Sequence, residues 1–386
     1  MMINSLPTPD ADAVAHSEQL KQHIVRQIAA AGGWLDFAQY MDTALYAPGL
    51  GYYSAGAKKF GPAGDFVTAP ELSPLFARTI ALQAAEVLHA TDGDLLELGA
   101  GSGRLAGDLL MELDRLGQLP SQYRILEVSA HLRQVQKDYL QKVLPTHLMQ
   151  RVGWLESLPA EFSGLVLGNE VLDALPVHVV QQQSGVLMQR GVGLAPDGEL
   201  QWMDKPADSH IEAAFCEIGL ADSYTTEICL AAGGLVASLA RMLQHGLVLL
   251  IDYGFPQHEY YHPQRQQGTL MCHYRHHAHG DPFLYPGLQD VTAHVDFTRV
   301  AEAAMQEGLD VMGYASQAQF LINCGITECL AAVSPHDLAA YAPLASAAQK
   351  LLSPAEMGEL FKVIALGRGM HEPLRGFSRG DKRHTL

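Results

Sequence analysis

The strongest constraint on the fold of this chain is one stretch, Leu95-Leu96-Glu97-Leu98-Gly99-Ala100-Gly101-Ser102-Gly103-Arg104-Leu105. Its first part is an apolar run that ends in an acidic residue, which is typical of a short buried strand. The glycines that follow allow a sharp turn and the close approach of a ligand, because they have no Cβ atom. Leucines at helical spacing between residues 104 and 116 then predict a helix. A strand, a glycine turn and a helix in this order indicate an α/β fold.

The spacing of the glycines separates two classes of ligand. Dinucleotide enzymes need G-x-G-x-x-G, but the place of the third glycine is taken by Arg104. The pattern here is G-x-G-x-G, at Gly99, Gly101 and Gly103, with Glu97 two residues before it. A carboxylate at that place repels a pyrophosphate and suits a ligand with an ammonium and a sulfonium group, such as S-adenosyl-L-methionine (SAM). A glycine turn without any ligand is the alternative that the motif leaves open.

Charge and composition exclude several classes of protein. The chain has 25 Lys and Arg against 42 Asp and Glu, a net charge of −17, which repels nucleic acid and anionic membranes and attracts basic partners. Simple solubility explains the charge equally well. No apolar run approaches the roughly 18 residues that cross a bilayer. The five cysteines are scattered, and the acidic N-terminus is unlike a signal or transit peptide. We therefore expect a cytoplasmic protein without membrane insertion.

Further strands are expected at about 123–128, 148–155, 164–168 and 247–254, with helices between several of them. This alternation predicts a mostly parallel, doubly wound sheet with helices on both faces. Ligands in such sheets bind at the carboxyl ends of the strands. The residues expected at that edge are Glu97, Glu127, Val128, Trp154, Leu155, Asn169 and Glu170.

The 386 residues are enough for about two to three domains, or for one domain with large insertions. The pattern predicts an N-terminal helical extension with a ligand-covering loop (1–90), the first part of the core (91–177), an inserted cap (178–245), the rest of the core with an acceptor-side module (246–370), and a flexible tail (371–386). Two helices are expected over about 334–366.

One candidate catalytic group is Asn169-Glu170-Val171-Leu172-Asp173, after the fourth strand. If a helix begins at Val171, Glu170 and Asp173 lie three residues apart on one face. Two carboxylates beside a SAM pocket could hold a nucleophile and take its proton. The alternative is that Asn169 and Asp173 only cap a helix and a turn.

A second polar group contains His294 and Asp296, which a strand would place on the same side. They could act as a base and the residue that orients it, or Asp296 could simply cap the next helix. The loop with Gly64, Asp65 and Thr68 could close over the ligand, or be an ordered loop without one. The histidines near Cys272 lack the spacing of metal ligands, so no metal is expected.

The chain also carries seven short motifs in a fixed order: Gly-Tyr-Tyr at 51–53, Gly-Asp-Phe-Val-Thr-Ala-Pro-Glu at 64–71, Glu-Leu-Gly-Ala-Gly-Ser-Gly at 97–103, Asn-Glu-Val-Leu-Asp-Ala-Leu-Pro at 169–176, Ile-Asp-Tyr-Gly at 251–254, Gly-Thr-Leu at 268–270 and Gln-Asp-Val-Thr-Ala-His-Val-Asp-Phe at 289–297. Together they resemble the MidA family of class I SAM-dependent methyltransferases. The resemblance covers about 35–370.

The resemblance implies a Rossmann-like doubly wound core with a helical N-terminal extension and an inserted α+β cap, and SAM as the methyl donor. The mitochondrial members are similar to an arginine methyltransferase that modifies a core subunit of respiratory complex I during assembly. By this analogy we expect a bacterial protein arginine N-methyltransferase whose partner is a protein with an exposed arginine.

An arginine acceptor agrees with the residues, because a guanidinium is always charged and the carboxylates of Glu170, Asp173 and Asp296 would orient it. The Asn/Asp-Pro-Pro-Tyr/Phe motif and the double-Glu loop of other methyltransferases are absent, so these catalytic roles rest on analogy. Two alternatives stay open, an assembly or interaction factor that binds SAM weakly or not at all, and a small-molecule methyltransferase. A homodimer also stays open.

Overall fold

The computed structural model describes residues 6–55, 68–215 and 218–386. The chain forms two compact units, each built from several stretches of sequence. The first unit contains 1–66, 173–232 and 257–296, and the second contains 67–172, 233–256 and 297–386. The sequence pattern did not anticipate that the N-terminal helices would group with residues 173–232.

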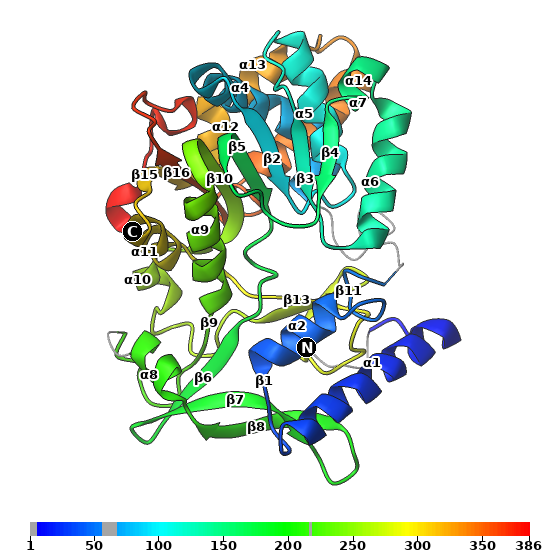
Figure 1. Ribbon diagram of the computed structural model, residues 1–386, viewed down its shortest axis with the longest axis vertical. Coiled ribbons are helices and arrows are strands. Elements are labelled where there is room, and N and C mark those ends of the chain that lie inside the picture. Colours follow the sequence, from blue (N-terminus) through cyan, green and yellow to red (C-terminus); the bar gives the residue numbers. More distant parts are fainter. Residues whose placement is uncertain (1–5, 56–67, 216–217) are drawn as a thin grey trace. The chain divides into compact units, whose positions relative to one another are not determined.

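The second unit is built on a sheet with the strand order β15-β16-β10-β5-β2-β3-β4 (Figure 1). Its strands are β2 (Asp94–Leu98), β3 (Tyr123–Leu126), β4 (Val152–Leu155), β5 (Phe162–Asn169), β10 (Leu243–Phe255), β15 (Asp310–Ser316) and β16 (Phe361–Arg368). The five strands from β4 to β10 are parallel, and β16 runs antiparallel to both β10 and β15. The chain order of the parallel strands reverses between β2 and β5, where doubly wound sheets bind their ligands.

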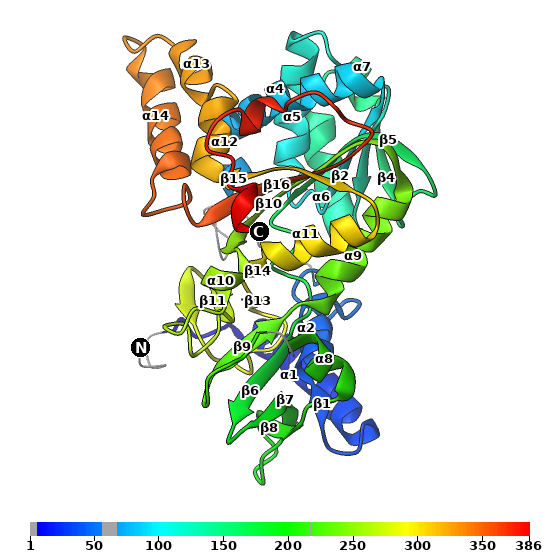
Figure 2. The ribbon, with the colours of Figure 1, turned by 90° about the vertical axis from the view of Figure 1, so that its left-hand side faces the viewer.

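Helices cover both faces of this sheet, with α4 and α5 on one side and α9 and α11 on the other (Figure 2). The helices are α3 (Ala69–Leu72), α4 (Pro74–Thr91), α5 (Arg104–Arg115), α6 (Ala130–Val143), α7 (Thr146–Met149), α9 (Leu230–Met242), α11 (Phe297–Gln306), α12 (Gln317–Asn323), α13 (Ile326–Ala331) and α14 (Leu338–Leu352). Leu95 and Leu165 pack with the α4 and α5 side chains, while Leu96 and Val166 are equally buried on the opposite face. The predicted Rossmann-like α/β fold is thereby confirmed.

The first unit has a sheet with the order β1-β7-β6-β9, in which β8 pairs with β7, and a small sheet β12-β11-β13. Its elements are α1 (Ala11–Ala30), β1 (Leu35–Asp36), α2 (Phe37–Tyr46), β6 (His178–Gln183), β7 (Val186–Leu194), β8 (Leu200–Pro206), α8 (Ser209–Phe215), β9 (Thr225–Ile228), α10 (Gln257–Tyr260), β11 (Met271–Tyr274), β12 (His277–His279), β13 (Asp290–Thr292) and β14 (Val295–Asp296). Apolar side chains of α1, α2 and β7 form its core.

One expectation about the C-terminal region was wrong. Residues 361–368 form strand β16 instead of the second expected helix. Its short, fully buried apolar run fits a central strand as well as a helix, and periodicity alone does not separate the two. The segment 371–386, which the sequence predicts to be a flexible tail, makes contacts within the second unit. Phe377 is buried against Phe320, and the Arg375 side chain donates to Glu86 at 2.7 Å.

In the part of the chain that the structure describes, every helix is too short or too polar to span a membrane.

Candidate functional site

The glycine turn after β2 has the backbone that its sequence predicts. Gly99, Gly101 and Gly103 have φ angles of 60°, 52° and 84°, in the left-handed region that favours glycine. Gly103 precedes the first residue of α5, and a Cβ atom there would lie 3.3 Å from the Cα atom of Gln136. The turn therefore brings bare backbone to the carboxyl end of β2 and to the N-terminus of α5.

A side chain from α3 holds this turn. The Ser102 hydroxyl donates a hydrogen bond to the Glu71 carboxylate, which also lies 3.7 Å from Arg104 Nη1. Thr68 is buried and precedes α3 at its N-cap position. Thr68 therefore lies directly before the short helix whose Glu71 side chain contacts the glycine turn. Gly64 and Asp65, the other residues expected in the covering loop, lie outside the described residues.

Glu97 is a buried carboxylate, 2% exposed, near the end of β2. Its pKa is raised to about 7, mainly by burial; a hydrogen bond from Tyr123 opposes the rise, and the nearby Glu127 carboxylate adds to it. The Tyr123 hydroxyl donates that bond to Glu97 Oε2 at 2.7 Å. Because burial disfavours the ionised form of this carboxylate, a cationic ligand beside it would stabilise that form strongly.

Glu127 follows β3, at the place expected for the carboxylate that binds ribose hydroxyls. Its Oε1 accepts the Ser129 N–H at 2.9 Å, and its Oε2 accepts a 2.9 Å hydrogen bond from Gln136. Burial raises its pKa, and these two hydrogen bonds and the charge of Arg133 oppose the rise. Next to it, the Val128 side chain is 71% exposed and provides an apolar surface.

Trp154 and Leu155 end the neighbouring strand β4. The Trp154 Nε1–H group donates to Gln136 Oε1 at 2.9 Å, and the Leu155 carbonyl accepts the Glu127 N–H at 3.3 Å. Gln136 was missed by the sequence reasoning, although it lies in the helix directly after Glu127. Its helical position gave no signal, because glutamine is common in helices and is mostly exposed there.

Asn169 is the last residue of β5 and Glu170 follows it, across the point where the strand order reverses. Glu170 has a φ angle of 53°, and its N–H donates to the Ile251 carbonyl at 2.8 Å. Asn169 Nδ2 donates to Glu170 Oε1 at 3.0 Å. Among the described residues, Asn169 Oδ1 has no hydrogen-bond partner although it is buried. The pair therefore offers a carboxylate and a buried oxygen acceptor at the ligand-binding edge of the sheet.

Asp252, in the Ile-Asp-Tyr-Gly motif, fixes the backbone after this pair. It is fully buried, and its Oδ2 accepts the N–H groups of Val171 at 3.1 Å and Leu172 at 2.8 Å. No role was assigned to Asp252 from the sequence. Its place at the end of a strand that neighbours β5 was the available signal.

The helix that would place Glu170 and Asp173 on one face does not form, because residues 171–175 make an irregular turn. The three-residue spacing of Glu170 and Asp173 therefore does not place them on one helical face. Asp173 belongs to the first unit, where its carbonyl accepts the Ala293 N–H at 3.0 Å. The N–H groups of residues 170–172 donate to the Ile251 carbonyl and to the Asp252 carboxylate, and these hydrogen bonds favour this turn over a helix.

His294 and Asp296 also belong to the first unit. The expected continuous strand is interrupted, because β13 ends at Thr292 and β14 begins at Val295. The His294 N–H donates to Thr269 Oγ1 at 3.1 Å, outside any strand ladder. Asp296 comes directly before α11. Alternation along one strand therefore does not relate the two side chains.

A buried carboxylate explains the Gly-Thr-Leu motif at 268–270. Glu227 in β9 is 1% exposed and accepts the N–H groups of Thr269 at 2.8 Å and Leu270 at 3.2 Å. A Cβ atom at Gly268 would lie 2.1 Å from Glu227 Oε1. The motif therefore wraps this carboxylate, which gives it a structural role in the first unit.

Two other motifs meet in the same unit. The Tyr53 hydroxyl donates to Asp290 Oδ1 at 3.0 Å, and the ring of Tyr53 stacks on Tyr46 with 5.5 Å between centroids. Burial and the charge of Asp290 raise the pKa of Tyr53 well above its ordinary value. Tyr53 and Asp290 thus connect the Gly-Tyr-Tyr segment with β13.

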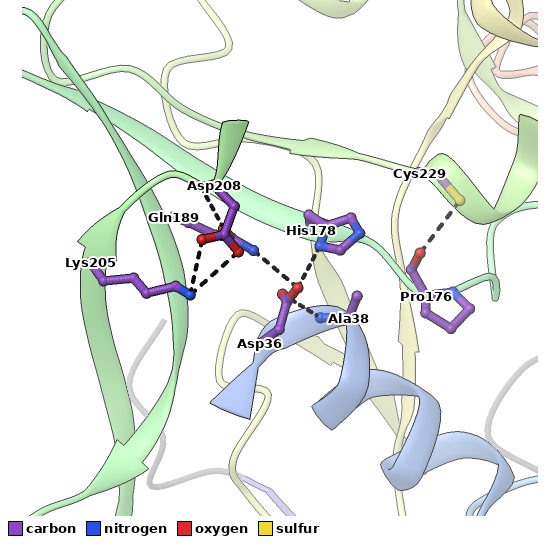
Figure 3. A network of polar contacts seen from close by, with 8 residues as sticks. All are labelled: Asp36, Ala38, Pro176, His178, Gln189, Lys205, Asp208 and Cys229. Atoms are coloured by element: carbon purple, nitrogen blue, oxygen red, sulfur yellow. Dashed lines mark hydrogen bonds and ion pairs between the residues drawn. The ribbon is translucent and has the colours of Figure 1, made fainter. Parts of the chain in front are cut away.

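A histidine–carboxylate pair lies elsewhere in the first unit (Figure 3). His178 Nδ1 lies 2.7 Å from Asp36 Oδ2, which also accepts a 3.0 Å bond from Gln189. Asp36 Oδ1 accepts the Ala38 N–H and so caps α2. This network joins β1, β6 and β7 to the start of α2, which is a structural task. No group of three potential metal ligands occurs within the described ranges.

The chemical groups that the second unit places at this edge of its sheet are suited to binding SAM. Positive-φ glycines leave room at a helix N-terminus, two buried carboxylates suit a cation and ribose hydroxyls, and Asn169 has a buried acceptor available. Residues 79–315 match a family described as "Putative S-adenosyl-L-methionine-dependent methyltransferase". The chain belongs to this family.

Solved structures agree with the family. A crystal structure of a protein from Burkholderia thailandensis bound to S-adenosyl-homocysteine (SAH) is 51% identical, with a TM-score of 0.96 over 99% of this chain and 100% of that chain. A native structure of an uncharacterized protein from the same organism is 50% identical, with a TM-score of 0.94 over 99% and 100% of the two chains. The chain is thus a SAM-dependent methyltransferase.

Curated relatives are more distant. The zebrafish (Danio rerio) protein arginine methyltransferase NDUFAF7, mitochondrial, is 28% identical over 91% of this chain and 87% of its own length. The human protein of the same name is 28% identical over 89% and 82% of the two chains.

Proposed function

We propose that this methyltransferase transfers the methyl group of SAM to a nitrogen of an arginine side chain in a protein. The name of the curated relatives supports an arginine acceptor. The single structural observation that carries the proposal is the Asn169–Glu170 pair, held at the carboxyl end of β5 by Asp252. The net charge of −17 favours a basic partner, and a cytoplasmic location belongs to the same proposal.

The proposed cofactor site lies at the carboxyl ends of β2 to β5. Glu97 faces the cationic methionine part of SAM, Glu127 binds the ribose, and Val128 and Trp154 border the adenine. The residues assigned to the site are Thr68, Glu97, Gly99, Gly101, Gly103, Glu127, Val128, Trp154, Leu155, Asn169 and Glu170, and from the sequence alone Gly64 and Asp65.

Bound SAM supplies an electrophilic methyl group on a sulfonium. The chain's own groups then position the acceptor, as methyl transfer needs an in-line approach in a water-poor site. In this proposal Glu170 and Asn169 Oδ1 accept hydrogen bonds from the guanidinium and direct one nitrogen. Glu170 also takes the proton that this nitrogen loses. From the sequence alone, Asp173, His294 and Asp296 remain candidates for binding the acceptor.

To test the proposal, the purified protein is incubated with methyl-labelled SAM and with an extract from cells in which the gene for this protein has been deleted. Labelled proteins are hydrolysed and their amino acids separated. The proposal expects label in methylarginine, and no label when Glu170→Gln replaces the wild-type chain. Label in methyllysine, or only in small molecules, would overturn the arginine acceptor without affecting the methyltransferase family.

A further inference from the structure

Gln136 connects three parts of the proposed cofactor site. This α6 residue is fully buried, and its amide touches the glycine turn, the end of β3 and the end of β4. Its Nε2 donates to the Gly101 carbonyl at 3.1 Å and to Glu127 Oε2 at 2.9 Å, and its Oε1 accepts from Trp154 Nε1 at 2.9 Å. Both amide hydrogens and the amide oxygen are therefore used.

Only one orientation of this amide satisfies the three neighbours. A flipped amide would place its oxygen against two acceptors, the Gly101 carbonyl and the Glu127 carboxylate, and its NH₂ group against the Trp154 donor. The partners therefore fix the rotamer of Gln136, and Gln136 in turn fixes them. A hydrogen bond to a charged carboxylate in a buried place is among the stronger ones.

We propose that Gln136 is the positioning residue that sets the affinity and the nucleoside specificity of the cofactor site. It holds the carboxylate of Glu127 for the ribose hydroxyls, the ring of Trp154 for the adenine side, and the backbone of Gly101. Without it, Glu127 loses a donor and Trp154 loses the acceptor that orients its ring. The inference rests on the proposed cofactor site, and it does not depend on the identity of the methyl acceptor.

The charged groups around this network come mainly from α6 and β2. The charge of Arg133 in α6 lowers the pKa of Glu127, and the Glu127 carboxylate raises the pKa of Glu97 in β2. The Lys137 ammonium, also in α6, lies 5.3 Å from the centroid of the Trp154 ring. Arg133 also pairs with Glu156 at 2.7 Å. None of these groups replaces the neutral amide, which donates to Glu127 and accepts from Trp154 at the same time.

The test is calorimetric titration of the full-length protein with SAH and with its 2′-deoxy analogue. Gln136→Met keeps the size of the side chain and removes the three hydrogen bonds. We expect SAH to bind about 10- to 100-fold more weakly. The preference of the wild-type chain for SAH over the 2′-deoxy analogue should also shrink, because Glu127 is no longer held against the ribose.

Gln134→Met is the matched control. Gln134 lies one half-turn away on the same helix, is exposed, and donates to Asp138 on the surface of that helix. Its replacement should leave both affinities unchanged. Trp154→Phe provides a second variant if Gln136→Met does not fold, since it removes one donor and keeps a ring. It should weaken SAH binding, and the double variant should lose no more than Gln136→Met alone.

A pH series separates positioning from packing. In Gln136→Glu the new carboxyl can donate to Glu127 only while it is protonated. SAH binding to this variant, divided by that of the wild type, should therefore improve as the pH falls, whereas Gln136→Met shows no such recovery. Unchanged SAH affinity in Gln136→Met, or an unchanged preference over the 2′-deoxy analogue, would overturn the inference. A wild-type chain that binds no SAH would overturn the cofactor site with it.

Discussion

The hydroxyl of Tyr123 donates a 2.7 Å hydrogen bond to the buried carboxylate of Glu97, so two neighbouring parallel strands share a titratable pair beside the glycine turn. Burial nevertheless dominates, and it holds the pKa of Glu97 at about 7. The site therefore contains a carboxylate that is only partly ionised near neutral pH. Several measurable properties depend on this carboxylate.

Cofactor affinity should increase with pH. Below pH 7 Glu97 is mostly neutral, and a ligand ammonium favours its ionised form, so binding releases a proton. Between pH 6 and pH 8 the affinity for SAH should rise about tenfold. Calorimetric titrations at these pH values check this, with Glu97→Gln as the variant whose profile is flat. A flat profile in the wild-type chain would contradict the prediction.

Stability should change with pH in the opposite direction. The folded pKa of Glu97, about 7, lies above its ordinary value of 4.5, so the unfolded chain loses this proton first as the pH rises. The contribution to stability is then lost between pH 4.5 and pH 7. At pH 8, without cofactor, Glu97→Gln should raise the free energy of unfolding by up to about 3 kcal/mol. Urea unfolding at pH 5 and pH 8 tests this, and equal effects at both values would argue against it.

Gly101→Val should abolish SAH binding. The residue has a φ angle of 52°, and a β-branched side chain strains that backbone. Gly117→Ala is the matched control, because Gly117 has a φ of 68° and open space around it. It should lower stability by about 1 kcal/mol and leave binding intact. Wild-type affinity in Gly101→Val, measured by the same titration, would remove the turn from the cofactor site.

Asp252→Ala should reduce methyl transfer more than cofactor binding. The change leaves the N–H groups of Val171 and Leu172 without their acceptor, which costs about 1–3 kcal/mol of stability and loosens the Asn169–Glu170 pair. We expect kcat to fall about 100-fold, the loss that misplacing a reacting group causes. Asp94→Ala is the control, since Asp94 accepts the Gln122 N–H at the opposite end of β2. Equal loss in both variants would indicate a general effect on stability.

Glu170→Gln should lower kcat about 100-fold or more, because the amide can neither balance the guanidinium charge nor take its proton. SAH affinity and the melting temperature should stay close to those of the wild type. His294→Ala and Asp296→Asn, measured beside it, test whether the first unit contributes to the reaction. If Glu170→Gln keeps full activity, another carboxylate is the base.

The sheet could be predicted from the sequence because its signals are local. The apolar runs that end in Glu97, Glu127 and Asn169 mark strands, and the glycine spacing marks the turn with its left-handed backbone. β16 was mistaken for a helix, since a short buried strand and a buried helix have similar composition. β16 pairs with β10 and β15, which are distant in the sequence, so local periodicity does not indicate this pairing.

The site residues that sequence reasoning missed act through distant partners. Gln136 acts on Gly101 and Trp154, and Asp252 acts on a turn 80 residues earlier in the chain. No helix forms after Glu170 for the same reason, because hydrogen bonds to the Asp252 carboxylate and the Ile251 carbonyl override the local preference. The spacing of residues within one segment therefore predicts which side chains lie at a strand end. It does not predict the residues, distant in the sequence, whose hydrogen bonds position those side chains.

The most direct test of the account is calorimetric titration of SAM and SAH into the purified wild-type chain and into Glu127→Ala. We expect binding to the wild type and at least about 100-fold weaker binding to the variant, because Glu127 is the carboxylate assigned to the ribose. Absence of binding to a folded wild-type chain, or equal binding to both chains, would contradict the cofactor site on which the proposed function is built.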